Sequence, residues 1–313
     1  MMTGRGPFLA SVAASARLVS PEGRHYSSAM VSRIEVQAGR TQEGAAPARP
    51  WRLASRSFGR LNGRGLWTLY LKEVKRFVNV ATQTLLAPVM TTLLFLAVFT
   101  LALGRGNTLV DGVSYGLFLV PGLTVMAMMQ NAFANTSSSI VIAKVQGNIV
   151  DVLMPPLSGF ELALGFAAGG VTRGLLVGLA VWTALSLFTS FAVHDLPAML
   201  FFATNACLML SLLGLIGGIW SEKFDHIAAV TNFVVTPLSF LSGTFYTVDR
   251  LPDGWQFLAH LNPFFYMIDG VRYGALGHAD SPLWVGALVL LAINAALFLL
   301  AWRILHTGWR LKA

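Results

Sequence analysis

Six long stretches without Asp, Glu, Lys or Arg constrain this chain more than any other feature of its sequence. A helix that crosses a bilayer needs about 20 apolar residues, and each stretch is at least that long. They cover residues 77–104, 112–143, 174–194, 196–221, 226–248 and 281–302. In hydrocarbon the backbone polar groups must bond to one another, and the strands of membrane barrels are only about 10 residues long. We therefore predict six membrane-spanning helices.

The composition agrees with an all-α integral membrane protein. Hydrophobic residues make up 55% of the chain and charged residues only 12%, whereas a soluble domain has about 25% charged residues. We place the predicted spans at residues 83–103, 116–137, 162–187, 197–219, 227–246 and 283–303. The net charge of +8 would favour nucleic-acid binding in a soluble protein. Here the basic residues flank the apolar runs, so they act as topology signals and we expect no nucleic-acid partner.

The basic residues are divided unequally between the two sides of the predicted membrane domain. With an even number of spans, both termini lie on the same side. That side would hold Arg52, Arg56, Arg60, Arg64, Lys72, Lys75, Arg76, Lys144, Lys223, Arg303, Arg310 and Lys312. The other side would hold only Arg105, Arg250 and Arg272. Because Lys and Arg accumulate on the cytoplasmic side of membrane proteins, we predict that both termini are cytoplasmic.

The first 50 residues have a different composition, rich in Ala, Ser, Gly and Arg. We expect residues 1–50 to be a disordered tail or a transit-like peptide; alternatively, translation starts later, for example at Met30. Residues 51–82 then form a cytoplasmic linker with an amphipathic helix at the membrane interface, and residues 83–313 form the transmembrane domain.

The amphipathic helix is predicted at residues 66–80 from its helical periodicity. Its apolar face consists of Trp67, Tyr70, Leu71, Val74, Phe77 and Val78. Its polar face consists of Lys72, Lys75, Arg76 and Asn79. A helix of this type lies in the interface, where it either anchors and orients the first span or presents a surface to a cytoplasmic partner.

The loop between the second and third predicted spans contains a candidate coupling element. A short helix can form from Lys144 to Met154, with Ile149, Val152 and Leu153 on one side. Pro155 and Pro156 would end it, and Ser158 with Glu161 fits a capping box that starts the third span. We predict a rigid knob that can transmit force from a partner; the alternative is a plain interhelical loop.

The third predicted span contains a basic residue, Arg173, about 12 residues or ~18 Å beyond Glu161. A charge near mid-membrane costs about 2.5 kcal/mol or more on insertion scales, so Arg173 must face protein or water. It either contacts an anionic head group on a transport pathway or pairs with a polar group on a neighbouring helix.

Glycines at four-residue spacing in the third and fourth predicted spans predict that these helices pack closely. They are Gly170, Gly174 and Gly178 in the third span and Gly214 and Gly218 in the fourth.

The segment of residues 247–282 is too long for a hairpin loop and not polar enough for an exposed one. Asn262 and Pro263 fit the cap and first position of a helix. The charge-free run of residues 254–268 is too short to span a bilayer, so we predict re-entrant or interfacial helices on the outer side. Asp269 and Arg272 are placed to pair on one helical face. The segment is either an interfacial plug or a gate at the outer mouth.

Motifs for catalysis and for nucleotide binding are absent from the sequence. It has no G-x-x-x-x-G-K-[ST] and no H-E-x-x-H, and we expect no catalytic residue, metal site or cofactor in this chain. Its acidic residues lie at span ends or in loops, which argues against a proton- or sodium-driven transporter. An ion-driven secondary transporter nevertheless stays an alternative, as does an ATP-independent membrane enzyme or scaffold.

Three sequence segments together resemble those of ABC-2 type permeases, the membrane subunits of ABC exporters. Residues Pro263, Phe264, Phe265, Tyr266 and Arg272 fit the family's pattern near its sixth span. Residues 148–158 and the Val120-Pro121-Gly122 sequence are similar to other family segments. The resemblance covers residues 66–313 and is closest to bacterial permeases related to nodulation lipo-oligosaccharide and daunorubicin exporters.

The resemblance implies a dimeric permease, with six spans per subunit, in the bacterial inner membrane. A separate ATPase, which carries the ATP and Mg²⁺, would dock on the knob and on the helix at residues 66–80. The expected coupling residues are Lys144, Asn148, Ile149, Asp151, Val152, Leu153 and Met154. The expected path or gate residues are Arg173, Asn262, Pro263, Tyr266, Asp269 and Arg272. The expected function is ATP-driven export of an amphipathic substrate, either a lipid-linked glycan or a hydrophobic drug.

Overall fold

The computed structural model describes residues 61–103, 109–110, 112–189, 193–248 and 251–310. These residues belong to one structural unit, residues 58–313. The predicted tail at residues 1–50 and the first part of the predicted linker, up to residue 60, lie outside the described residues.

The prediction of an all-α membrane protein with six spans is confirmed. Six helical segments are long and apolar enough to cross a bilayer. They are α3 (Ala81–Leu103), α4 (Tyr115–Val145), α6 (Gly159–Ser186), α7 (Leu196–Trp220), the continuous run α8–η2–α9 and α12 (Leu283–Thr307). Each predicted span starts within three residues of the observed segment, but α4 continues to Val145 instead of ending at residue 137, and the fifth segment ends at Leu241 instead of residue 246.

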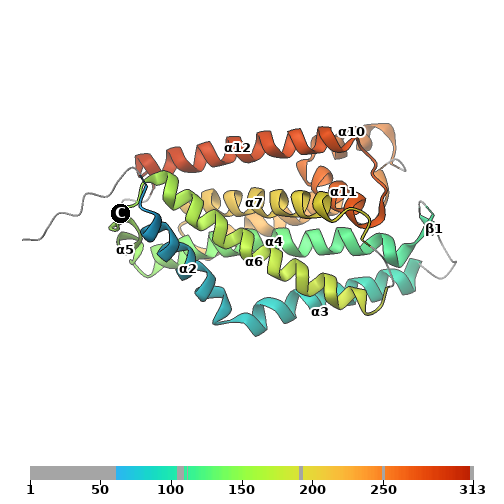
Figure 1. Cartoon of the computed structure of the whole chain (residues 1–313), viewed down its shortest axis with the longest axis horizontal. Coiled ribbons are helices and arrows are strands. Elements are labelled where there is room, and N and C mark those ends of the chain that lie inside the picture. The colour runs from blue at the N-terminus through green and yellow to red at the C-terminus, as the bar shows by residue number, and fades with distance from the viewer. Residues whose placement is uncertain (1–60, 104–108, 111, 190–192, 249–250, 311–313) are drawn as a thin grey trace, which may run out of the picture. The chain divides into compact units, whose positions relative to one another are not determined.

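Shorter elements lie at the two ends of the long helices (Figure 1). At one end, called the α5 end, lies α5 (Ile149–Leu153). The other end is called the β1 end and carries β1 (Leu109–Val110), which pairs antiparallel with β2 (Val113–Ser114). The remaining short helices are α2 (Gly63–Val78), α10 (Asp253–Leu261) and α11 (Pro263–Leu276). Helix α2 corresponds to the predicted amphipathic helix, while α10 and α11 correspond to the predicted re-entrant segments; their position in the membrane stays a prediction.

The fifth span is not the single regular helix predicted at residues 227–246. It consists of α8 (Phe224–Val230), a π-helical turn η2 (Thr231–Val235) and α9 (Thr236–Leu241). Pro237 lies in the first turn of α9 and cannot donate a main-chain hydrogen bond to the preceding turn, and its ring crowds the carbonyl four residues earlier. A π turn relieves this crowding, so the proline explains the irregularity.

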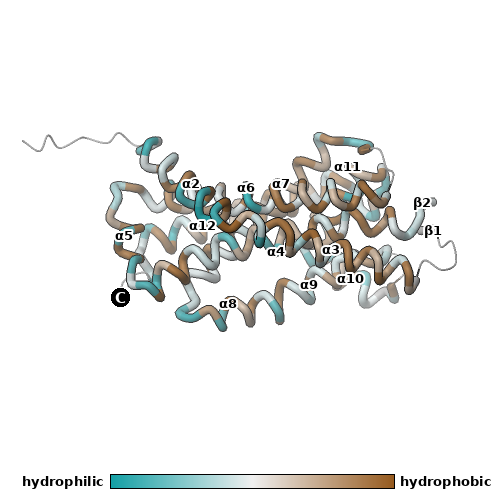
Figure 2. Tube along the Cα trace, turned by 90° about the horizontal axis from the view of Figure 1, so that it is seen from below, coloured by the Kyte–Doolittle hydropathy of each residue, from teal (hydrophilic) through white to brown (hydrophobic). Residues whose placement is uncertain are grey.

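Helices α4 and α7 form the centre of the fold, and most of their side chains are buried. Helices α3, α12 and α8–α9 leave most of theirs on the surface. The predicted close packing at glycines is confirmed: a Cβ at Gly174 would lie 2.6 Å from the Cys207 sulfur and 3.1 Å from the Met128 carbonyl oxygen. Figure 2 shows hydrophobic residues along the long helices and hydrophilic segments toward the α5 end.

Candidate functional site

The short helix predicted in the loop between the second and third spans, called the knob, is present but shorter than predicted; its role in coupling stays a prediction. Helix α4 continues to Val145, Gly147 turns the chain with a φ of 73°, and α5 covers only Ile149–Leu153. The Lys144 ammonium donates to the main-chain carbonyls of Ile219 and Ser221, at 3.1 Å for Ser221. The prediction of one helix from Lys144 to Met154 is therefore wrong, because glycine ends the long helix and Lys144 binds the end of α7.

The knob has one buried and one exposed side. Ile149 and Val152 are buried and pack in a cluster with residues of α6, α7 and α12. Leu153 packs against the same cluster. Asn148 and Asp151 are exposed, as are Val150 at 56% and Met154 at 76%. Apolar side chains thus hold α5 to the long helices, while a mixed polar and apolar face is available to a partner.

The capping box predicted at the start of the third span is confirmed and extends further than expected. The Ser158 main-chain N–H donates to Glu161 Oε2 at 2.7 Å, and the Glu161 N–H donates to Ser158 Oγ at 3.3 Å. The Asn62 N–H donates to the other Glu161 oxygen, and Asn62 Nδ2 donates to the Pro156 carbonyl at 3.3 Å. The residues before α2, the prolines after α5 and the start of α6 are therefore joined at one point.

A buried polar network attaches α2 to α4. The Glu73 side chain is fully buried; it accepts hydrogen bonds from Arg76 at 3.1 Å and from Ser139 Oγ at 2.7 Å. The Arg76 guanidinium also donates to the Asn135 carbonyl at 2.6 Å and to Ser138 Oγ at 3.1 Å. Arg76 was predicted on the solvated face of α2; it binds α4 instead, since Glu73 needs a buried cation.

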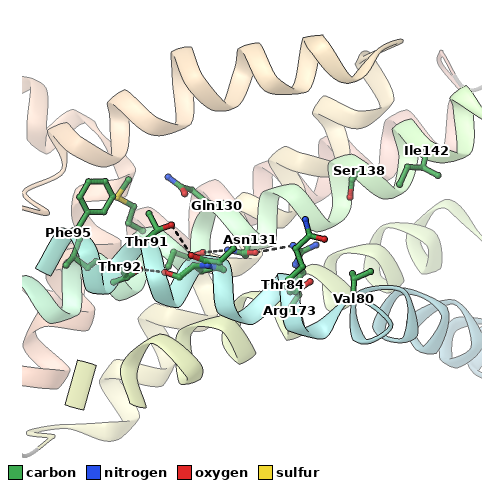
Figure 3. A pocket seen from close by; sticks show the side chains of 16 residues that line it. Val80, Thr84, Thr91, Thr92, Phe95, Gln130, Asn131, Ser138, Ile142 and Arg173 are labelled. Atoms are coloured by element: carbon green, nitrogen blue, oxygen red, sulfur yellow. Dashed lines mark hydrogen bonds between the residues drawn. The ribbon is translucent and has the colours of Figure 1, made fainter. Parts of the chain in front are cut away.

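A cavity of about 710 Å³ lies between α3 and α4, with Arg173 of α6 at its wall (Figure 3). Its polar lining residues are Gln83, Thr84, Thr91, Thr92, Gln130, Asn131, Ser138 and Arg173. One Arg173 guanidinium nitrogen donates to Asn131 Oδ1 at 3.1 Å. Both sequence interpretations of Arg173 are therefore compatible with its position, because it bonds a neighbouring helix and lines a cavity.

A second cavity of about 530 Å³ lies between α3 and α6 and is mostly apolar. Its lining comes from the end of α2 and from Ala81, Leu85, Leu176, Leu179, Ala180 and Leu187, among others. Arg173 and Thr84 line both cavities. The guanidinium thus lies at the boundary between a polar cavity and an apolar one.

The predicted outer residues are brought together at the β1 end. Asn262 caps α11: its Oδ1 accepts from the Phe264 N–H at 3.1 Å, and its Nδ2 donates to the Leu238 carbonyl at 2.9 Å. Pro263 occupies the first turn as predicted. Tyr266 is partly buried and packs edge-on against Phe265, and burial raises the pKa of its hydroxyl. Asn262 therefore joins α11 to the end of α9.

The predicted direct pair of Asp269 with Arg272 is wrong, and Asp280 joins the two instead. Asp269 accepts hydrogen bonds from the N–H groups of Asp280 at 2.7 Å and Ser281 at 3.0 Å. Arg272 is buried, with its guanidinium 3.6 Å from the Asp280 carboxylate and 4.2 Å from the centre of the Phe118 ring. It also donates to the Gly243 carbonyl at 2.5 Å. The loop after α11 folds back and contacts both side chains.

Sequence reasoning missed Glu73, Asn131 and Asn135 as structural partners of the two arginines. Two signals could have identified them. Glu73 precedes Arg76 by three residues, which is helical pairing distance. Asn131 and Asn135 are one turn apart on a single face of an apolar span, and polar side chains within a span usually face another helix.

Comparison with known proteins matches residues 64–276 to the ABC-2 type transporter family. The chain is 40% identical over 249 residues to the Inner membrane transport permease YadH of Escherichia coli K12, covering 79% of this chain and 97% of that protein. It is 26% identical over 241 residues to Nodulation protein J of Neorhizobium galegae, covering 74% of this chain and 88% of that protein. Nodulation protein J of Rhizobium meliloti is also 26% identical, over 243 residues, with 74% and 90% covered.

Proposed function

The chain belongs to the ABC-2 type transporter family, and from that premise we propose that it is the permease subunit of an ATP-driven exporter. It is a membrane transporter permease with six candidate spans. Family membership implies a partner ATPase. In our proposal the partner holds ATP and Mg²⁺ and hydrolyses the nucleotide, whereas this chain performs no catalysis and forms the passage through the bilayer.

The observation that best supports the proposal is that α5 has one side buried against the long helices and one side exposed. Its Ile149 and Val152 side chains are buried against the long helices, while Val150, Asp151 and Met154 are exposed at the tip. The ATPase would dock on this exposed face and on the exposed lysines of α2, Lys72 and Lys75. A push on α5 would reach α4 directly and α6 through Pro156, whose carbonyl accepts a hydrogen bond from Asn62, which in turn donates to Glu161.

Movement of α4 relative to α6 would change the cavity that they share. Asn131 of α4 and Arg173 of α6 are joined at 3.1 Å on its wall. We propose that an amphipathic substrate, a lipid-linked glycan or a hydrophobic drug, passes along this region. The segment that holds Asn262, Pro263, Tyr266, Asp269 and Arg272 would cover the outer mouth as re-entrant helices.

The proposed location is the bacterial inner membrane, with both termini in the cytoplasm. The name of the Escherichia coli relative refers to the inner membrane, and the basic residues accumulate on the side that holds the termini. A second permease copy, identical or similar, would complete the passage. The largely exposed, apolar helices α3 and α8–α9 are available for lipid or for that copy.

The docking proposal is tested by co-purification with a candidate Walker-motif ATPase that is produced together with this chain. The double substitution Val150→Asp with Met154→Asp places charges on the exposed face of α5. His306→Asp, at an exposed site near the end of α12, is the matched control. We expect the α5 variant to lose the ATPase and the control to retain it. Equal recovery of the ATPase with both variants would show that α5 is not the docking site.

The transport proposal is tested by reconstitution of both subunits in vesicles. Export should require ATP and should stop when the catalytic base of the ATPase is removed. Transport by the permease alone, driven by an ion gradient without nucleotide, would overturn the proposal in favour of a secondary transporter.

A further inference from the structure

The charge of Arg173 has no counter-ion among the residues that the structure describes. Its guanidinium donates to the neutral Asn131 amide, and its Nε is buried without a hydrogen bond. Arg76 lies close enough to repel it electrostatically, but Arg76 is itself neutralised by Glu73 at 3.1 Å. This leaves one net positive charge near the middle of α6, where an uncompensated charge is costly.

The charge lies where two cavities of different character meet. The cavity between α3 and α4 offers hydroxyl and amide groups from Thr91, Gln83 and Gln130. The cavity between α3 and α6 is lined largely by leucines and alanines. Their volumes, about 710 and 530 Å³, lie within the range of about 300–1,000 Å³ that is typical of small-molecule pockets.

No carboxylate lines either cavity within the described part of the chain, so nothing there opposes the binding of an anion. A guanidinium presents two parallel N–H groups that match a phosphate or carboxylate group. A polar head would find hydrogen-bonding partners on one side of Arg173, and an alkyl chain would be removed from water on the other side. Helix α3 borders both cavities and is largely exposed, so a ligand can arrive laterally from the bilayer.

We propose that these two cavities form one binding site for an anionic amphiphile, with its acidic head group at Arg173 between α3 and α4 and an alkyl chain between α3 and α6. The inference rests on the proposed transport function and narrows its substrate class. Among amphipathic substrates, it selects those with a negative charge next to an alkyl chain, and it disfavours cationic and neutral drugs.

The site is tested on the full chain, purified in a neutral detergent, by native mass spectrometry of bound lipid. The probes are lysophosphatidic acid, lysophosphatidylcholine with the same alkyl chain, and glycerol 3-phosphate, which has the acidic head without the chain. We expect lysophosphatidic acid to bind at least about tenfold more tightly than either of the others. Equal binding of the two lipids would overturn the charge assignment, and equal binding of glycerol 3-phosphate would overturn the two-cavity site.

Substitutions at two positions of the site, Arg173 and Ala180, separate the contribution of the charge from that of the apolar cavity. Arg173→Gln should lower the affinity for lysophosphatidic acid about tenfold and leave lysophosphatidylcholine unchanged. The unchanged binding of lysophosphatidylcholine excludes misfolding of Arg173→Gln as the cause of the loss, and Arg173→Lys, which keeps the charge, should retain the preference. Ala180→Trp should fill the apolar cavity and weaken binding of both lipids, whereas Leu288→Trp, on the exposed side of α12, should not.

The binding measurement is independent of the ATPase. If Arg173→Gln leaves the lipid preference unchanged while the ATPase still co-purifies, the head-group site is wrong and the exporter proposal stands. If the α5 substitutions leave the ATPase bound while lysophosphatidic acid binding depends on Arg173, the docking proposal is wrong and the lipid site stands.

Discussion

The Arg76 guanidinium lies 3.1 Å from the carboxylate of Glu73, one turn earlier on α2, and the same guanidinium reaches the Asn135 carbonyl of α4 at 2.6 Å. The pair is therefore the polar core of the contact between α2 and α4 rather than a surface ion pair. Since Glu73 is fully buried, its carboxylate would be left in the interior without a cation if Arg76 were removed, whereas the Arg76 side chain is 26% exposed.

Glu73→Gln should destabilise the protein by about 1.5–3 kcal/mol, because it replaces the charged hydrogen bonds that Glu73 accepts from Arg76 and Ser139 by weaker, neutral ones. Thermal unfolding in detergent measures the effect. Lys75→Gln, an exposed site on the same helix, is the matched control and should change stability by less than about 0.5 kcal/mol. Similar melting temperatures for the two variants would contradict a structural role for the pair.

A double-mutant cycle should show that Glu73 and Arg76 act together. Removing both side chains, with Glu73→Ala and Arg76→Ala, should cost less than the sum of the two single substitutions, with a coupling of about 1–3 kcal/mol. Strict additivity of the unfolding free energies would mean that the two groups do not interact in the folded state.

Arg272→Ala should destabilise the β1 end by about 3–5 kcal/mol. The substitution removes a guanidinium that lies 3.6 Å from the Asp280 carboxylate and 4.2 Å from the centre of the Phe118 ring. Arg272→Lys should recover part of the lost stability, since an ammonium keeps the charge. The recovery should be incomplete, because an ammonium lacks the planar contact of the guanidinium with the Phe118 ring. Hydrogen exchange of residues 243–248 and 276–286 measures the local effect; unchanged protection in Arg272→Ala would disprove it.

The two sides of α5 should respond differently to truncation. Ile149→Ala removes buried contacts and should lower the stability by about 2–4 kcal/mol. Met154→Ala, on the exposed side, should leave the melting temperature unchanged and weaken only the association with the ATPase. The two measurements are unfolding in detergent and co-purification. A stability loss in Met154→Ala that equals the loss in Ile149→Ala would show that both sides pack against the long helices.

Gly174→Ala should be strongly destabilising, because the new methyl group would lie 2.6 Å from the Cys207 sulfur. Adding Cys207→Ala removes that sulfur and should restore part of the stability, since the new methyl group on α6 no longer clashes with it and α6 can again pack closely on α7. The rescue would be incomplete, because the Met128 carbonyl would still lie 3.1 Å from the new carbon. A double variant no more stable than Gly174→Ala alone would exclude the Cys207 contact as the cause.

The six spans could be predicted from sequence because hydrocarbon excludes charge so strongly that its absence marks each helix. The capping box at Ser158 and Glu161 could also be predicted from sequence, since it depends on two residues at a fixed spacing. The π-helical turn in the fifth span could not be predicted, because the effect of Pro237 on the backbone depends on the helix around it. The length of α5 was missed because Gly147 was not recognised as the end of α4.

Side-chain partners across helices were the least predictable part of the site. The expected Asp269–Arg272 pair follows from local spacing, yet the return of the chain at Asp280 supplies nearer partners. Likewise, the amphipathic pattern at residues 66–80 placed Arg76 on the polar face, because the burial of Glu73 arises only when α2 packs on α6 and forms hydrogen bonds with α4. Such partners depend on how segments far apart in sequence are placed in space.

The length of α4 has a consequence for the surrounding lipid. Its 31 residues rise about 46 Å at 1.5 Å per residue, while the hydrocarbon layer is about 30 Å thick. Because Phe118 near one end contacts Arg272 and Lys144 near the other end binds the carbonyls of α7, tilting this rod alone would disturb contacts at both ends. In membranes made from shorter or longer acyl chains, we therefore expect the bundle to tilt as a whole or the bilayer to deform around it, rather than α4 to tilt by itself.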